Sequence, residues 1–465
     1  MSFLFLLGII GTVISLPNPL VFFPIGIFIS FIPLFIFNSK FSRIKIFLLN
    51  LLFSEAVALA VLIPLDAKRL IFDARQVFFL VLVFMLIAII YALFFTFSAY
   101  LSKKCSYLFR PFLFGAGWVA AQQLLSKLPF LFPFPLETAL VPFPIMIQSA
   151  GILSSFFLGF LIIYTNAVFA EIYLRRNRLL FLLIPLIIIH AVNVGYGYIS
   201  LNRKENHGPK VKIAIIQPNI SPKERLLMER GIFFKKYFDQ RLIYQSKEAL
   251  KKNVKLVIWP ELSGNYILQD DAYLSYLHGK ITSKGAELLL GTSYIDYSHG
   301  GNIFNIAFIL KENGDATEKY RKQKIFPFSE TEDYSSGKKT LTLSSRSGLG
   351  RVGVMICLES LYPEVARKLV SEGANILCLI SSDTSFGNSS IPYLHSKLIA
   401  LRAVENNRYA VHVGNSGPST VADNKGRIIL EIPYGKIAYG TAEIKTITDI
   451  SLDPLSSHSI PKRLL

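Results

Sequence analysis

Three residues in the second half of the chain, Glu261, Lys322 and Cys357, have side chains that together suffice for acyl transfer. A cysteine attacks a carbonyl carbon as its thiolate, which forms near neutral pH only beside a base or a positive charge. A carboxylate can take the thiol proton when partial burial raises its pKa, and a fixed ammonium can stabilise the oxyanion that develops on the attacked carbonyl. This chemistry requires no histidine.

Each of the three residues stands at or just beyond a stretch that is typical of a β-strand. Glu261 follows "KLVIWP", Lys322 lies in "YRKQKIFPFSE", and Cys357 closes "VGVMIC". Singly, each has an ordinary explanation: Glu261 as a carboxylate that begins a helix, Lys322 as part of a solvated basic run, and Cys357 as a small core residue. Together, at strand ends where an α/β fold exposes side chains, they indicate one site.

The other two cysteines are expected to be inert, and no metal or cofactor is predicted. Cys378 lies in the apolar run "NILCLI", which is typical of a buried strand, and Cys105 lies at the edge of an apolar segment. Three cysteines cannot form a disulfide framework, and the sequence contains neither C-x-x-C nor a Cys/His spacing typical of a metal site.

After about residue 210, short apolar strands alternate with longer helical stretches. Strands are predicted at 211–217, 255–259, 287–294, 303–311, 350–356, 375–381 and 409–414. Helices are predicted within 223–251 and at 363–371 and 391–405. This alternation is typical of a layered α/β fold, so we expect one such domain over residues 211–450 and a C-terminal tail at 451–465.

The first 200 residues have the composition of a membrane protein. The chain of 465 residues is 52% hydrophobic, and most of the excess lies before residue 200. A helix needs about 20 apolar residues to cross a bilayer. Segments near that length are 3–16, 20–37, 46–65, 77–101, 111–125, 146–170 and 179–198. We expect a transmembrane helical domain of about seven helices over residues 1–200 and a polar linker at 201–210.

The lysines and arginines of the loops predict the orientation of this domain. With a cytoplasmic N-terminus, the inner loops carry basic clusters such as Lys103–Lys104 and Arg175–Arg176, and the outer loops carry fewer basic residues. An odd number of spans then places everything after residue 200 outside the cytoplasm. The basic residues behind the net charge of +18 are dispersed, so we expect a membrane surface and no nucleic acid as partner.

Two features of the membrane half stand out. Glu55 lies within an apolar segment, where a carboxylate is a functional candidate, although a structural role at a helix interface is favoured. The stretch "LPFLFPFPLETALVPFP" at 128–144 is too rich in proline for a helix and too apolar for a solvated loop. We expect it to lie along the membrane surface, with its apolar side chains among the lipid head groups.

Taken in order, "VIWPE", "YRKQKIFPFSE", "GVMICLESLYPE" and "RAVENNRYAVHVGNSG" resemble the motifs of the carbon-nitrogen hydrolase (nitrilase) superfamily. A membrane half joined to such a domain resembles the apolipoprotein N-acyltransferases within that superfamily. This resemblance implies an α-β-β-α sandwich behind the transmembrane helices. It also implies that Glu261 is the general base, Lys322 the oxyanion stabiliser and Cys357 the nucleophile.

The resemblance extends to supporting residues. Glu330 and Glu359 match carboxylates that the family keeps in its active site, and the backbone N–H of Leu358 is expected to help hold the oxyanion. Glu359 is expected to order the base and the lysine rather than to cap a helix. The apolar residues of 262–277, directly after Glu261, are candidate flaps over a pocket that opens toward the membrane. Two positions depart from the family's pattern: Leu358 stands where a tyrosine is common, and Ser385 where a tryptophan is expected. The chain also ends at "SSHSIPKRLL", whereas the family usually has a further membrane helix there.

The function implied is transfer of a fatty acyl chain from a membrane phospholipid, through a cysteine thioester, to the N-terminal amine of the S-diacylglyceryl cysteine of an apolipoprotein. The location implied is the bacterial cytoplasmic (inner) membrane, with the catalytic domain on the periplasmic side and the protein a monomer. One alternative is a membrane-tethered amidase of the same superfamily, in which water resolves the intermediate. Another is a non-catalytic scaffold or transporter with a degenerate domain.

Overall fold

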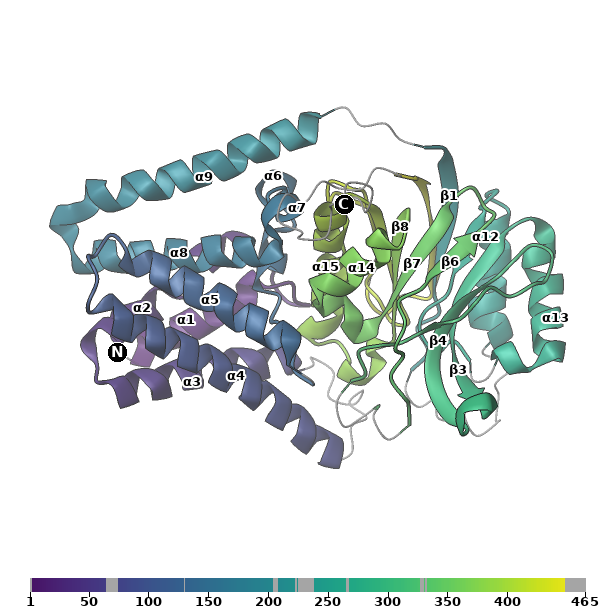
Figure 1. Ribbon diagram of the computed structural model, residues 1–465, viewed down its shortest axis with the longest axis horizontal. Coiled ribbons are helices and arrows are strands. Elements are labelled where there is room, and N and C mark those ends of the chain that lie inside the picture. Colours follow the sequence, from purple (N-terminus) through teal and green to yellow (C-terminus); the bar gives the residue numbers. More distant parts are fainter. Residues whose placement is uncertain are drawn as a thin grey trace, which may run out of the picture.

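The computed structural model describes residues 2–63, 74–128, 130–203, 208–221, 224, 238–264, 267–326, 330 and 333–447. Figure 1 shows a bundle of helices on one side and two β-sheets on the other. The predicted tail at 451–465, part of the predicted linker and part of the predicted helix within 223–251 lie outside the described residues.

The membrane half is helical in each of the predicted apolar segments. Its helices are α1 (Ser2–Ser15), α2 (Ile32–Lys40), α3 (Arg43–Leu62), α4 (Ala74–Ser102), α5 (Arg110–Lys127), α6 (Pro144–Ile147), α7 (Ala150–Leu153), α8 (Ser155–Leu174) and α9 (Leu179–Asn202). Among the described residues, four helical segments are long and apolar enough to cross a membrane: Arg43–Leu62, Val77–Ser102, Ser155–Leu174 and Arg176–Asn202. That all of the segments cross the membrane stays a prediction.

In two of the predicted apolar segments, the α-helix does not extend over the whole segment. In 20–37, a short 3-10 helix (Pro24–Phe28) precedes α2. In 146–170, the helix is interrupted at Ser154, which has a φ of 68° and separates α7 from α8.

Glu55 lies on α3, and its Oε2 is buried without a hydrogen-bond partner among the described residues.

The expectation for the proline-rich stretch 128–144 was wrong. Residues 131–141 pack inside the protein, with Leu131, Phe132 and Val141 buried and the 3-10 helix Leu136–Leu140 buried throughout, whereas Phe130 (51%) and Pro142 are exposed. Its apolar side chains lie against the helices of both halves of the protein rather than among lipid head groups. An apolar segment can be buried by protein side chains as well as by lipid, and the sequence does not distinguish these two environments.

The second half is an α-β-β-α sandwich, as predicted. The described residues form two sheets of six strands, in the orders β12-β1-β2-β3-β4-β5 and β11-β10-β9-β8-β7-β6. The first contains β1 (Lys210–Gln217), β2 (Leu256–Ile258), β3 (Glu287–Asp296), β4 (Asn302–Leu310), β5 (Tyr320–Arg321) and β12 (Ala438–Lys445). The second contains β6 (Thr342–Ser345), β7 (Gly350–Ile356), β8 (Ile376–Ser381), β9 (Tyr409–Gly414), β10 (Ser419–Ala422) and β11 (Ile428–Ile432).

Helices cover the outer faces of the two sheets. A π-helix (Phe238–Ile243), α12 (Tyr244–Leu250) and α13 (Asp271–Lys280) accompany the first sheet, and α14 (Pro363–Ser371) and α15 (Ser390–Asn406) accompany the second. Figure 1 shows α15 between the bundle and the sheets, and α13 at the opposite end of the molecule. β1, β2 and β3 run parallel, as do β7, β8 and β9, so several polar segments leave the sandwich at the carboxyl ends of neighbouring strands.

Glu405, which belongs to a buried ion pair on α15, connects the two halves of the protein. Arg402 of α15 is paired with Glu405 one turn later, and both are almost fully buried. Glu405 also accepts a hydrogen bond from the backbone N–H of Ser155 at 2.7 Å, so a catalytic-domain carboxylate caps the N-terminus of the membrane helix α8. Nearby, the Tyr362 hydroxyl donates to the carbonyl oxygen of Leu131 at 2.6 Å.

Replacing Glu405 by alanine should strongly destabilise the protein. The Glu405→Ala change leaves the Arg402 guanidinium buried without its carboxylate, which costs about 3–5 kcal/mol. Arg427→Ala is the matched control, because the Arg427–Asp423 pair is exposed (52% for the Arg427 side chain) and should be worth less than about 1 kcal/mol. Equilibrium unfolding in detergent micelles measures both; equal losses would contradict the proposed role of the pair.

Candidate active site

Cys357 occupies a strained turn between a strand and a short helix. β7 ends at Ile356, and the 3-10 helix Cys357–Leu361 begins at the cysteine. The φ of Cys357 is 50°, in the left-handed region, which costs a residue with a Cβ roughly 1–3 kcal/mol. Strain of this kind occurs where a turn presents a side chain at a fixed angle, so the geometry favours a nucleophile over an ordinary core residue.

Lys322 lies at the centre of a buried charge cluster. Its side chain directly follows β5 and is 0% exposed, and its Nζ donates to Glu261 Oε1 at 3.0 Å and to Glu330 Oε1 at 2.7 Å. Within the described part of the chain, these acceptors use two of its three N–H donors. The third N–H has no acceptor among these residues.

Both sheets hold Glu261 in place. The residue follows β2, and its Oε1 accepts a second hydrogen bond, at 2.7 Å, from the Asn305 side chain on β4. Its Oε2 accepts from the backbone N–H of Ser382, just after β8 of the other sheet, at 2.9 Å. The close approach of β3 requires glycine at position 291, where a Cβ would lie 3.0 Å from the Glu261 Cα. The Glu261 carboxylate is therefore held in one position by both sheets.

The electrostatics of the cluster favour a protonated thiol at rest. Burial raises the pKa of Cys357 well above its usual value, and the charge of Glu261 raises it further against the opposing effect of Lys322. Burial also raises the pKa of Glu261, with Lys322 opposing the shift. Burial works to lower the pKa of Lys322, but Glu261 and Glu330 outweigh it and raise that pKa. The thiol therefore needs a base at the moment of attack, and Glu261 is suited to the task.

Glu359 orders the backbone on both sides of the triad. Its carboxylate accepts hydrogen bonds from the backbone N–H of Gln323 at 2.6 Å and from the Tyr320 hydroxyl at 2.9 Å, which positions the segment that carries Lys322. It also accepts from the backbone N–H of Ile356 at 2.7 Å, so it caps the short helix that begins at Cys357. We expected an ordering role instead of a capping role, and Glu359 has both. Burial raises its pKa to about 7.

An apolar pocket adjoins Cys357, and the membrane half supplies part of its wall. Phe84 of α4 and Phe132, Phe134 and Pro135 of the stretch 128–144 line it together with catalytic-domain residues. The catalytic domain contributes Phe326, Leu358, Leu361, Phe386, Ile391, Leu394 and His395. The side chain of Leu358 thus lines the pocket. Its backbone N–H lies in the first turn of the 3-10 helix, where N–H donors have no partner within the helix.

The described residues of 262–277, which exclude 265 and 266, do not form a flap over this pocket. We expected the apolar residues of 262–277 to do so, but Ile267 and Leu277 pack with Trp259 in the core between the first sheet and its outer helices. In Figure 1, α13 lies on the side of the sandwich away from the bundle. The lid-like residues come instead from 128–144, for which we had predicted a different place.

The structure adds a buried Asp–His pair to the site. His395 Nδ1 lies 2.9 Å from Asp383 Oδ1, and both residues are buried. A ring nitrogen of His395, a carboxylate oxygen of Asp383 and the Sγ of Cys357 lie within 4.8 Å of one another, a donor set that could hold a divalent ion such as Zn²⁺. Burial works to lower the pKa of His395, but Asp383 outweighs it and raises that pKa.

Sequence reasoning missed this pair and the two groups that orient Glu261. Asp383 lies in "SSDTSFG", where attention had gone to Ser385, and His395 is on α15, a helix assigned no function. Asn305 on β4 and the Ser382 N–H carried no signal, because a strand asparagine and a backbone amide are ordinary features of any sequence. The Asp and the His stand twelve residues apart in the sequence, and that spacing alone does not indicate that they meet.

Comparison with known proteins gives a consistent result. The family model described as "Carbon-nitrogen hydrolase" matches residues 212–450. Three curated proteins named "Apolipoprotein N-acyltransferase" are similar to the chain: 26% identical over 63% of it for Rickettsia bellii, 28% over 64% for Geobacter metallireducens and 29% over 71% for Aquifex aeolicus. The matches span 61%, 61% and 74% of the length of these relatives.

Two substitutions beside Glu261 should shift the pH dependence of acyl-enzyme formation in opposite directions. The rate should rise with pH as Glu261 becomes a carboxylate. Glu330→Gln removes a charge that raises the Glu261 pKa, so the rise should move to lower pH. Asn305→Leu removes a hydrogen bond that lowers this pKa, so the rise should move to higher pH. Single-turnover intact-mass measurements across pH test this, and shifts in the same direction would exclude Glu261 as the base.

Proposed function

Because the chain belongs to the carbon-nitrogen hydrolase family, we propose that it moves a fatty acyl chain by way of a thioester on Cys357. The donor in this proposal is a membrane phospholipid, and the acceptor is the N-terminal amine of an S-diacylglyceryl cysteine. The observation that carries the proposal is the apolar pocket beside Cys357, because part of its wall comes from the membrane half. The names of the similar proteins point to the same reaction.

In the first half of the proposed reaction, Cys357 takes the acyl group from the phospholipid. Glu261 accepts the Sγ proton as sulfur attacks the ester carbonyl carbon, and the third N–H of Lys322 and the Leu358 N–H stabilise the oxyanion. Collapse of the tetrahedral intermediate breaks the ester C–O bond. The departing lysophospholipid oxygen takes the proton from Glu261, which leaves a thioester and a carboxylate.

In the second half, the acceptor amine attacks the thioester carbonyl. Glu261 accepts a proton from the amine nitrogen, and the same donors stabilise the second oxyanion. The C–S bond breaks, the Cys357 sulfur recovers the proton from Glu261, and an amide leaves the site. In the alternative hydrolase reaction, water takes the place of the amine and free fatty acid is the product. The apolar lining of the pocket favours the transferase, because it disfavours water next to the thioester.

An intact-mass experiment separates transferase from hydrolase. Purified protein in phospholipid micelles without acceptor should accumulate one acyl adduct, and a diacylglyceryl-cysteinyl peptide should discharge it to an N-acyl peptide. Cys357→Ala should form no adduct, Lys322→Ala should slow its formation by roughly 10²–10³-fold, and Cys105→Ala should behave as wild type. Rapid release of free fatty acid with no amide product would reject the transferase and leave the amidase.

The proposed location is the bacterial cytoplasmic membrane, with the catalytic domain on the periplasmic side. The apolar helices support membrane insertion, and the loop charges support this orientation. An enzyme that is active only in the periplasm, fused after Leu465, should therefore be active. Activity from a cytoplasm-only reporter at that position, with the periplasmic reporter silent, would reverse the orientation.

A further inference from the structure

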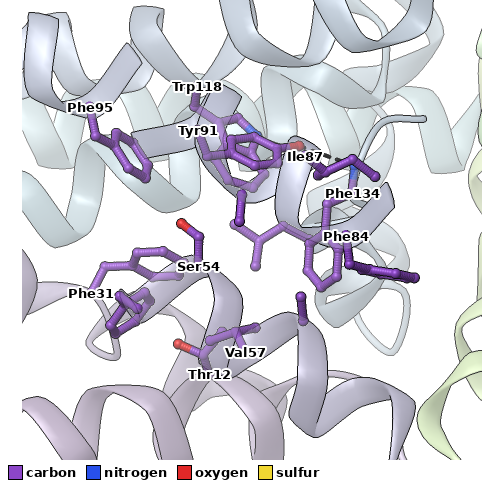
Figure 2. A pocket seen from close by; sticks show the side chains of 14 residues that line it. Thr12, Phe31, Ser54, Val57, Phe84, Ile87, Tyr91, Phe95, Trp118 and Phe134 are labelled. Carbon is purple, nitrogen blue, oxygen red and sulfur yellow. Dashed lines mark hydrogen bonds between the residues drawn. The ribbon is translucent and has the colours of Figure 1, made fainter. Parts of the chain in front are cut away.

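The helical bundle contains an apolar cavity that borders the pocket at Cys357. The cavity lies among α3, α4 and α5, with Phe31, Thr12 and Phe134 from neighbouring segments completing its wall. Figure 2 shows Phe84 and Phe134 toward one end of the cavity and Phe31 and Phe95 toward the other. The same two residues, Phe84 and Phe134, also line the pocket that contains Cys357. These two residues therefore form a wall that both spaces share.

The cavity is suited to hydrocarbon and not to water. Its lining is almost entirely aromatic and aliphatic, and its few polar groups are the hydroxyls of Thr12, Ser54 and Tyr91 and the Nε1 of Trp118, of which those of Thr12 and Tyr91 have hydrogen-bond partners. Thr12 donates to the carbonyl oxygen of Gly8 at 2.9 Å, and Tyr91 donates to Gln122 at 3.0 Å. Because a buried water needs two to four polar partners, a cavity with so few polar groups favours apolar ligands.

The boundary between the two spaces is built from one fixed backbone and two aromatic rings. The Phe134 N–H donates to the Tyr91 hydroxyl at 3.1 Å, and its carbonyl oxygen accepts from the Gln122 side chain at 2.8 Å. Figure 2 shows the hydrogen bond from the Phe134 N–H to the Tyr91 hydroxyl as a dashed line. The backbone is therefore held, while the Phe84 and Phe134 side chains can change rotamer and open a passage.

We propose that the bundle cavity binds the tail of the acyl chain carried on Cys357 and that its far wall limits the length of that chain. The pocket at Cys357 and the bundle cavity have Phe84 and Phe134 in common as lining residues. A chain too long for the first space meets its next apolar space directly behind Phe84 and Phe134. The inference rests on the proposed acyl-enzyme and adds a binding site for the tail inside the membrane half.

Filling the cavity should shorten the preferred chain. Ala58 on α3 and Ala88 on α4 are buried lining residues, so Ala58→Leu and Ala88→Leu place methyl groups where the tail would lie. With phospholipids that carry 8-, 12-, 16- or 18-carbon chains, both variants should slow formation of the 16- and 18-carbon adducts by about tenfold or more. Adducts of 8 carbons should form at the wild-type rate. Ala60→Leu, on α3 but outside the lining, is the matched control and should not change the ratio.

Failure of the inference and failure of the proposed function give different results. Wild-type protein that forms no adduct with any chain length would reject the acyl-enzyme itself. Adducts of every length with unchanged ratios in both variants would reject the bundle cavity as the tail site.

A second measurement uses the wild-type protein and does not depend on the folding of a variant. A 16-carbon donor with a terminal diazirine is loaded onto Cys357 and irradiated, and the crosslinked peptide is sequenced. Attachment within α3, α4 or α5 at residues of the cavity wall supports the tail site. Attachment confined to the catalytic domain or to lipid overturns it.

Discussion

The buried ammonium of Lys322 is the constraint on which the site depends. Removing such a charge from water costs several kcal/mol, and only close carboxylates and further hydrogen bonds recover that cost. Glu261 and Glu330 provide the carboxylates at 3.0 and 2.7 Å, and each needs donors for its remaining oxygen. Those donors are the N–H groups of Ser382 and Phe326. The charge of Lys322 is therefore stabilised only where strand ends from both sheets meet. The turn after β7 presents Cys357 at the same place.

The same cluster explains why the membrane half belongs to the site. Two carboxylates around one ammonium leave excess negative charge, which helps to keep the neighbouring thiol protonated. Electrostatic effects of this kind are strong only where water is excluded. The aromatic residues of 128–144 and Phe84 of α4 provide that exclusion, and the Arg402–Glu405 pair with its bond to Ser155 holds the helices in place. The catalytic domain alone would have an open site.

How far the sequence predicted this structure depended on whether a signal was local. Strands such as β1 and β8 are continuous apolar runs, and Glu261 and Cys357 stand directly after such runs, so these features have a local signal in the sequence. β5 has only two residues and β12 contains Gly440 and Thr441, so neither has a recognisable apolar run. The stretch 128–144 and His395 needed knowledge of remote partners: an apolar segment looks the same whether lipid or protein covers it, and Asp383 meets His395 only because α15 folds back beside β8.

The fixed position of Glu261 has a consequence for the order of the proposed steps. The base accepts a proton from sulfur and returns it to the departing lysophospholipid oxygen, so it is a carboxylate again when the thioester forms. An incoming neutral amine therefore meets a carboxylate that can accept its proton. A protonated amine is attracted by the excess negative charge of the cluster, but it has no free lone pair and cannot attack. Because Asn305 and the Ser382 N–H hold the carboxylate in both steps, the two nucleophiles have to approach along the same direction. One rigid base can therefore serve both halves of the reaction only if the donor's head group has left before the acceptor enters.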